Sequence, residues 1–297
     1  MNKTKLYHYV PQFYLKNFQI PKGQNMIWCF DKVTSRTFRV DIRKIGCGKD
    51  FYDEDSEKYL SNLESQISPV CKKIVETRDL GKLNWTERVT MAKFVAIQDT
   101  RSQEGRIAMQ EVGEALIGRI VEVSPTLKQM INKGMVKGIR GIIREKAAAM
   151  AKETQIGLLK QEIELFAEML LGLQWILIEN KTKMPLWTSD NPVNKYNPIK
   201  ALPYLGNLGY LCSGIEIFLP VSPVLCLCLC DLGTHRLVPS EKLLMQSKQN
   251  VIYQNYFQLA QSSRHVFSRR NDFSLATKIL KAQPYLSNPL RKRTISS

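Results

Sequence analysis

The spacing of apolar residues changes twice along the chain, and this change limits the fold more than any other feature. Between about residues 56 and 173, apolar side chains recur every three or four positions, which indicates a block of helices. Before and after this block, short runs rich in β-branched and aromatic residues indicate strands. This order predicts one α+β domain over residues 1–270, with a mixed or antiparallel sheet from the N- and C-terminal strands packed against the helices. Residues 271–297 then form a basic C-terminal tail.

The strand regions can be divided further by their turn signals. HYVPQFYLKNF predicts a short helix with Pro11 in its first turn, where a missing N–H costs nothing. MIWCFDKVTSRTFRV predicts two strands joined by a turn. QWILIE and PLWTS predict two strands around the turn NKTKM, and EIFLPVSP and VLCLCLCD predict two more. The run VLCLCLCD is apolar on both faces and is therefore expected at the centre of its sheet. Ser240 opens a last helix that continues to about Leu259, and RHVFS ends the ordered part as a short strand.

The formal net charge of +16 comes from basic residues gathered in three regions. Lys and Arg outnumber Asp and Glu by ten to three in residues 1–50, by eight to two in 126–160, and by eight to one from 264 to the end. Such a field attracts polyanions, so we expect nucleic acid as the partner, RNA before DNA, and no membrane. The alternative is that the excess charge only improves solubility.

Cysteine and histidine usage limits the cofactors. Seven scattered cysteines, an odd number, argue against a disulfide framework and for a reducing compartment, which favours the cytoplasm. The chain has no CxxC pair and three histidines, so we expect no metal site and no cofactor. Cys226, Cys228 and Cys230 point to one side of their strand and are read as core residues, because three thiolates in line do not close a tetrahedral site. The oligomeric state stays open, with a homo-oligomer as one option.

Several motifs occur in an order that resembles a known family. They are HYVPQFYLKNF, FDK, KDFY, Glu64, FVAIQDTR, WTSDNPV, LPVSP and SSRHVFS. Together they are similar to domain-of-unknown-function family 4238, a prokaryotic group, and the resemblance covers His8 to Ser268. It implies one domain and indicates which polar residues to consider for a site; it implies no particular activity.

His8 is the first candidate for catalysis. A histidine near a helix N-terminus feels positive backbone charge, which lowers its pKa and favours the neutral imidazole. That form suits a general base if a partner orients the ring. The alternative is a histidine that packs and hydrogen-bonds locally. Gln12 lies one helical turn further on, either sharing a ligand with His8 or solvated.

The motif TSDNPV supplies Ser189, Asp190 and Asn191 after a short strand. Residues at strand ends commonly gather into sites, so Asp190 is a candidate for a general base, a metal ligand or the group that orients His8. The same residues are also good turn formers, because Asp and Asn bond to their own backbone and Pro192 fixes φ. Both interpretations stay open.

The motif QDTR places Gln98 and Arg101 on one face of a helix. Arg offers bidentate donors that match a phosphate or a carboxylate. The structural alternative is a buried ion pair between Arg101 and Asp190. A weaker outer group is Lys49, Tyr52, Glu64, Asn255 and Arg264, and a core position is favoured for His265.

Two functions of different classes follow. The first is a metal-independent ribonuclease or phosphodiesterase of a bacterial antiviral defence or toxin type. In it His8 is the acid/base, Asp190 orients it, and Arg101, Lys49 and Arg264 neutralise charge on the phosphate. The second is a non-catalytic nucleic-acid-binding or regulatory module that binds through the basic residues 126–160 and the RKR run at 291–293. The first requires His8, Asp190 and Arg101 to converge in an open pocket.

Overall fold

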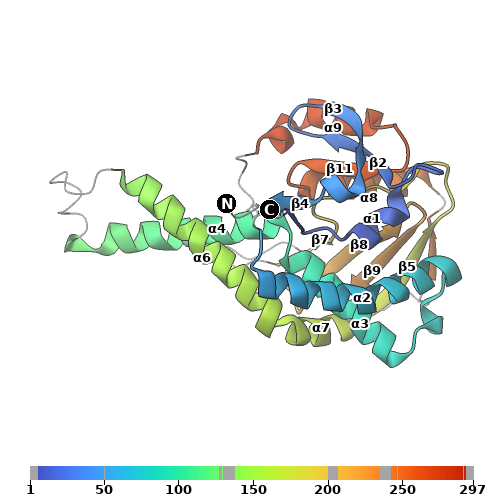
Figure 1. Ribbon diagram of the computed structural model, residues 1–297, viewed down its shortest axis with the longest axis horizontal. Helices are drawn as coiled ribbons and strands as arrows, with labels where there is room; N and C mark the ends of the chain where they lie inside the picture. Colours follow the sequence, from blue (N-terminus) through green and yellow to red (C-terminus); the bar gives the residue numbers. More distant parts are fainter. Residues whose placement is uncertain are drawn as a thin grey trace.

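The computed structural model describes residues 6–49, 51–126, 129, 138–199, 207–234, 242–245, 247–289 and 291, without the side chains of 139 and 140. Within the described residues, two larger sheets and one two-stranded sheet lie beside a group of helices, and one pair of helices extends away from the rest (Figure 1). The prediction of an α+β fold, with a mixed or antiparallel sheet packed on helices, is confirmed. No helix in the described part of the chain is long and apolar enough to span a membrane.

A four-stranded antiparallel sheet joins the two ends of the chain, in the order β3-β2-β11-β6. Its strands are β2 (Met26–Asp31), β3 (Arg36–Asp41), β6 (Thr188–Ser189) and β11 (His265–Ser268). β2 and β3 are the predicted hairpin, and β11 is the predicted strand RHVFS. The expectation that N- and C-terminal strands share a sheet is therefore confirmed.

The second sheet has five strands in the order β10-β5-β9-β8-β7. They are β5 (Gln174–Asn180), β7 (Asn194–Tyr196), β8 (Glu216–Ser222), β9 (Leu225–Cys230) and β10 (Lys242–Met245). Every residue of β9 is buried between β5 and β8, as predicted for a central strand. Its three cysteines lie in one apolar cluster, which confirms the core interpretation. β5 and β6, predicted around one turn, belong to different sheets.

The N-terminal segment begins with a two-stranded ladder. β1 (Leu6–His8) pairs antiparallel with β4 (Cys47–Lys49), and α1 (Gln12–Leu15) follows Pro11. Pro11 is the N-cap of α1, one position before the first turn in which the sequence predicted it. His8 ends a strand, and three residues separate it from the helix.

The predicted helical block contains α2 (Glu54–Thr77), α3 (Trp85–Thr100), α4 (Gln103–Val123), α6 (Ile139–Gln161) and α7 (Ile163–Leu171). Side chains of Asp53, Asn84 and Ser102 accept backbone N–H bonds at the starts of α2, α3 and α4, which explains where these helices begin. α6 and α7 are separated only by Glu162.

The C-terminal region differs from its prediction in two places. The expected helix from Ser240 starts later, because β10 precedes α8 (Lys248–Gln261); Ser240 itself lies outside the described residues. Order does not end at Ser268: α9 (Ser274–Ala282) follows and packs with α8. Phe273 at its start stacks on Phe30, with ring centroids 5.5 Å apart, so apolar burial orders part of the expected tail.

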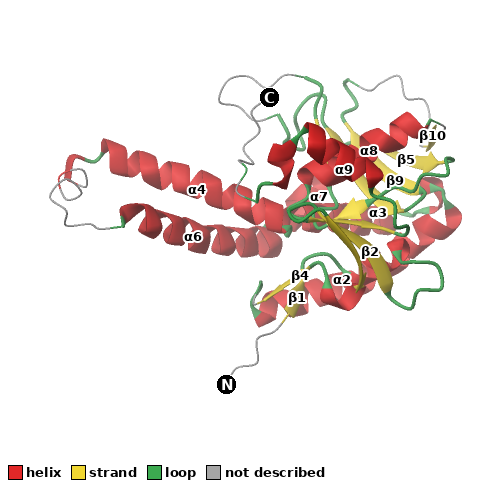
Figure 2. Ribbon diagram, turned by 90° about the horizontal axis from the view of Figure 1, so that it is seen from above, coloured by secondary structure: helices red, strands yellow, loops and turns green. Residues whose placement is uncertain are grey.

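α4 and α6 run side by side away from the sheets and form a projection that we call the helical arm (Figures 1 and 2). Gln155 of α6 is buried at the base of this arm. Its amide donates to the carbonyls of Thr100 and Ser102 at 2.7 and 3.1 Å, and its oxygen accepts from Arg106. Gln155 thus fastens the arm to the end of α3. Of the basic segment 126–160, residues 127, 128 and 130–137 lie outside the described part.

Replacing Gly113 with leucine is expected to destabilise the protein by about 1–3 kcal/mol, because a larger side chain overpacks the arm. A Cβ atom at Gly113 would lie 3.3 Å from Cβ of Ala147 on α6. Gly118→Leu on the same helix is the matched control, since no atom of the described chain lies within 4 Å of its Cβ position. Urea denaturation should show Gly118→Leu at or above wild-type stability. Equal losses in both variants would contradict the close packing at Gly113.

Candidate functional site

The end of α3 carries a buried polar cluster centred on Arg101, whose side chain is fully buried. Its Nε donates to Oε1 of Gln98 at 2.7 Å, and its Nη1 donates to Oε1 of Glu64 at 2.8 Å. Gln98 in turn donates to the carbonyl of Tyr9 at 3.3 Å. The predicted shared face of Gln98 and Arg101 is therefore real. The predicted ion pair with Asp190 is wrong, because Glu64 is the carboxylate that pairs with Arg101.

His8 belongs to the same cluster but not for the reason that the sequence suggested. It pairs with Cys47 across the β1–β4 ladder and does not lie in a helix. Burial lowers the pKa of the His8 imidazole below its ordinary value of 6.5, opposed by the Glu64 carboxylate and supported by the Arg101 charge. The direction agrees with the prediction, whereas the main cause is desolvation rather than a helix N-terminus.

Two nitrogen atoms of this cluster are left over. Within the described part of the chain, Nε2 of His8 and Nη2 of Arg101 are buried and have no hydrogen-bond partner. An unpaired buried polar group costs about 1–3 kcal/mol, so native proteins usually supply a partner from the chain, from water or from a ligand. We call His8, Glu64, Gln98 and Arg101 the arginine cluster.

Of the other predicted residues near the arginine cluster, one contacts its backbone, one is exposed and one is half-buried. Tyr52 donates its hydroxyl to the carbonyl of Arg101 at 3.1 Å and so supports the backbone of the site. Lys49 is exposed at the end of β4, and Gln12 is half-buried on α1. Glu57 was not predicted; burial and the Glu64 carboxylate raise its pKa. The seven-residue spacing of Glu57 and Glu64 on one helix was the signal that indicated a shared face.

The carboxylate of Asp190 has a structural role, because it binds backbone. Its carboxylate accepts three backbone N–H bonds, from Ser263 at 2.8 Å, Arg264 at 2.8 Å and His265 at 2.7 Å. The side chain is 1% exposed, and its other near contact is Nδ1 of His265 at 3.9 Å. Because both oxygens already hold the start of β11, Asp190 is not free to orient His8.

The remaining predicted site residues surround Asp190 and bind backbone. Ser189 contacts Asn191 and Gln258, and Asn191 donates to the carbonyl of Gln261. Asn255 accepts from the backbone N–H of Trp187 at 2.8 Å and donates to the carbonyl of Pro185. These bonds attach α8 to the segment before β7.

Arg264 is the one residue of this group with an exposed side chain, and it pairs with Asp31 of β2 at 2.7 Å. Burial raises the pKa of Asp31, but Arg264 and the hydrogen bonds from Val33 and Thr34 together lower it to about 2. The predicted convergence of His8, Asp190 and Arg101 in an open pocket is therefore wrong: Arg101 is fully buried in the arginine cluster, and Asp190 belongs to a separate group that binds backbone. Within the described residues, no group of three or more His, Cys, Asp and Glu side chains could hold a metal ion.

The fold and this cluster define a mixed α+β protein in which a buried arginine at the end of α3 pairs with a carboxylate of α2, with a histidine of lowered pKa on β1. The chain belongs to the family described as protein of unknown function (DUF4238), whose model matches residues 7–272. This confirms the resemblance drawn from the motifs. No curated protein and no solved structure matches the chain.

Proposed function

We propose that the chain is a metal-independent phosphodiesterase acting on RNA, with the arginine cluster as its active centre. His8 is the acid/base, Arg101 holds the phosphate, and Glu64 takes the orienting role that the sequence assigned to Asp190. The observation that supports this proposal is the pair of unpaired buried nitrogens, one on His8 and one on Arg101. A phosphate oxygen is an acceptor that suits Nη2 of Arg101, and a ribose hydroxyl is a donor that suits unprotonated Nε2 of neutral His8.

The chemistry follows from the protonation states. Neutral His8 takes the proton from a ribose 2′-hydroxyl, whose oxygen attacks phosphorus. The bond from phosphorus to the 5′-oxygen breaks, that oxygen leaves with a proton from water, and a 2′,3′-cyclic phosphate remains. Arg101 stabilises the negative charge that develops on the non-bridging oxygens. The step needs the 2′-hydroxyl, which is why RNA is preferred to DNA.

The charge distribution supports a polyanionic substrate. Exposed Lys44 lies in the turn that follows β3. The backbone carbonyls of Ile42 and Arg43 in the same turn interact with the His8 ring and raise its pKa. Exposed Lys49 lies opposite Leu6 on the strand that pairs with His8. These cations, which are part of the net charge of +16, favour approach of a nucleic acid backbone.

A second candidate is a non-catalytic nucleic-acid-binding module, and the saturated carboxylate of Asp190 favours it. In that function the polar motifs hold the fold, and basic surfaces such as the exposed Arg144 and Lys146 of α6 bind phosphates. The two candidates differ in one respect: the phosphodiesterase needs His8 to cleave RNA, whereas the binding module cleaves nothing.

His8→Gln is expected to lower the rate of RNA cleavage by about 10²–10⁴-fold, the usual contribution of a general acid/base. The assay uses labelled RNA and matched DNA, with and without EDTA, and the wild type should cleave RNA in both conditions. His265→Gln is the control, because His265 is also half-buried and also has a pKa lowered by burial, but lies beside Asp190.

The pH profile supplies a second readout. Because the active form of His8 is neutral and its pKa lies below 6.5, activity should persist below pH 6.5 and fall only as the pH drops through the His8 pKa. Equal cleavage by wild type and His8→Gln would disprove the role of His8. Salt-sensitive RNA binding without any cleavage would select the binding module, and loss of cleavage with EDTA would exclude a metal-independent mechanism.

A further inference from the structure

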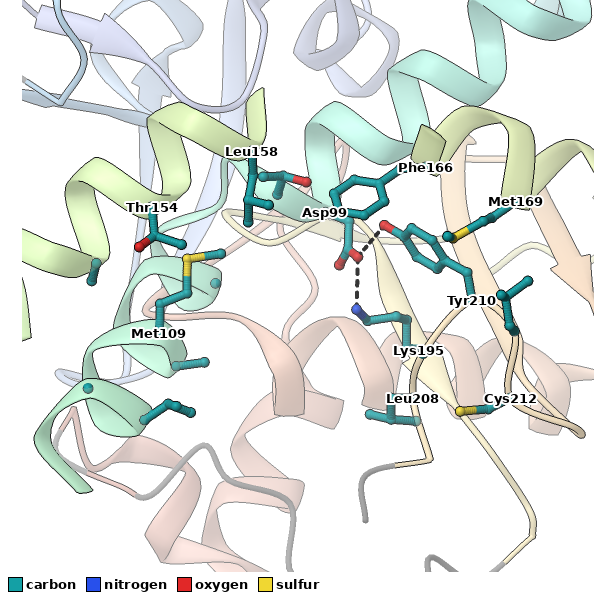
Figure 3. Close-up of a pocket in the computed structure, with 18 of the residues that line it drawn as sticks. Asp99, Met109, Thr154, Leu158, Phe166, Met169, Lys195, Leu208, Tyr210 and Cys212 are labelled. Carbon is teal, nitrogen blue, oxygen red and sulfur yellow. Dashed lines mark hydrogen bonds and ion pairs between the residues drawn. The ribbon is translucent and has the colours of Figure 1, made fainter. Parts of the chain in front are cut away.

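A cavity of about 900 Å³ lies where the helical arm meets the body. Its walls come from α4, α6, α7 and the segment around Leu208 to Cys212 (Figure 3). Pockets that hold small molecules usually measure about 300–1,000 Å³ and are mostly apolar with a few polar groups. This cavity has both properties and is formed by residues that the arginine cluster does not use.

The walls are apolar along most of their length. Met109, Leu158, Phe166, Met169 and Leu208 surround the space, and Gly105 and Ala108 of α4 keep it open because their side chains are small. Val112 and Leu116 continue the same wall outward along the arm, and both are more than half exposed. Together they provide an elongated apolar surface that favours an extended hydrocarbon.

One end of the cavity is polar (Figure 3). Oδ2 of Asp99 accepts from Nζ of Lys195 at 2.8 Å and from the hydroxyl of Tyr210 at 2.6 Å. Burial raises the pKa of Tyr210 well above its ordinary value, and the nearby Asp99 carboxylate adds to this, so the phenol stays neutral. Both hydrogen bonds use the same oxygen of Asp99, which leaves Oδ1 able to accept from a bound molecule.

The charges at this end cancel. Lys195 and Asp99 form an ion pair whose side chains are 25% and 16% exposed, so the pair is largely removed from water. A ligand carboxylate beside this pair is attracted by Lys195 but repelled by Asp99. A ligand ammonium is attracted by Asp99 but repelled by Lys195. An uncharged group that donates and accepts hydrogen bonds matches Asp99 Oδ1 and the remaining Lys195 protons without an uncompensated charge.

We infer that this cavity binds an elongated, uncharged amphipathic molecule, of the class of long-chain alcohols and amides. The hydrocarbon chain lies along α4 and α6, and the hydrogen-bonding group contacts Asp99, Lys195 and Tyr210. This site is separate from the arginine cluster: Asp99 leaves α3 on a different face from Gln98 and Arg101, as its position one residue after Gln98 requires.

The test is calorimetric titration of the full chain with 1-decanol, decanoate and decylamine below their aggregation limits. The wild type is expected to bind 1-decanol at least about tenfold more tightly than either charged probe. Asp99→Asn removes the negative partner of Lys195, so the preference should move toward decanoate by about tenfold or more. Ala108→Phe fills the cavity and should weaken all three probes, and circular dichroism checks that each variant is folded.

Each remaining outcome contradicts the inference. Decanoate bound as tightly as 1-decanol by the wild type, or an unchanged preference in folded Asp99→Asn, would show that the polar end does not select the ligand. No binding of any probe, together with a dimer in light scattering, would instead assign the apolar walls to contact with a second copy of the chain.

Discussion

Asp190→Ala is expected to destabilise the protein by about 3–5 kcal/mol, because several buried backbone N–H groups lose their acceptor at once. The carboxylate holds the N–H groups of Ser263, Arg264 and His265, and its side chain is 1% exposed. Ser263 and Arg264 lead into β11 and His265 begins it, and this strand connects β2 to β6. Loss of Asp190 therefore weakens the sheet that joins the two ends of the chain.

Asp272→Ala is the matched control for this effect. Asp272 also accepts a backbone N–H, from Ser274, but it is exposed, so water replaces the lost acceptor. Its loss should cost less than about 1 kcal/mol, whereas Asp190→Asn should fall between the two because one oxygen acceptor remains. Urea denaturation measures all three. A loss below about 1 kcal/mol for Asp190→Ala would show that these N–H groups find other partners.

Arg101→Lys is expected to lower RNA cleavage by about 10²–10³-fold while the protein stays folded. Lysine keeps the positive charge beside Glu64, but it lacks the planar group that reaches Gln98 and Glu64 with separate N–H donors. It also lacks the counterpart of Nη2, the nitrogen that the proposed function assigns to a phosphate oxygen. The readout is the cleavage rate at saturating and at limiting RNA, since a phosphate contact made in the transition state lowers both.

Arg270→Lys serves as the control, because Arg270 is exposed and donates to the carbonyl of Lys183, away from the arginine cluster. It should cleave RNA at the wild-type rate. The thermal midpoint of Arg101→Lys should fall by only a few degrees, about the effect of one or two lost hydrogen bonds. If Arg101→Lys cleaves like the wild type, Arg101 is a structural residue and the active centre must be elsewhere.

The element types could be predicted from the sequence where local pattern decides them. The β-branched and aromatic runs of β2 and β3, the apolar run of β9 and the helical spacing of apolar residues in α2 were all visible, and the structure confirms these elements. The sequence predicted a helix from Ser240 onward, whereas Lys242–Met245 forms β10. This strand depends on parallel pairing with β5, a tertiary contact that no local pattern records.

The candidate site could be predicted only in part, for a similar reason. Helical spacing correctly put Gln98 and Arg101 on one face. Spacing did not show which carboxylate faces Arg101, because Glu64 and Asp190 are both distant in sequence and chain packing alone selects Glu64. The QDTR motif also contains Asp99, but the partners of Asp99, Lys195 and Tyr210, come from later segments of the chain. No local pattern therefore indicated the polar end of the cavity.

The four-stranded sheet has a consequence for how the protein is made. Arg264 and Asp31, which join β11 to β2, are 233 positions apart in the chain. At a synthesis rate of roughly 5–20 residues per second, β2 waits on the order of ten seconds or more on the ribosome before its partner strand exists. The helices of the middle region can form by then from local contacts, whereas the sheet closes only after nearly the whole chain has emerged. During that interval the β2–β3 hairpin has an open strand edge at β2, with unpaired backbone groups that can pair with another exposed strand.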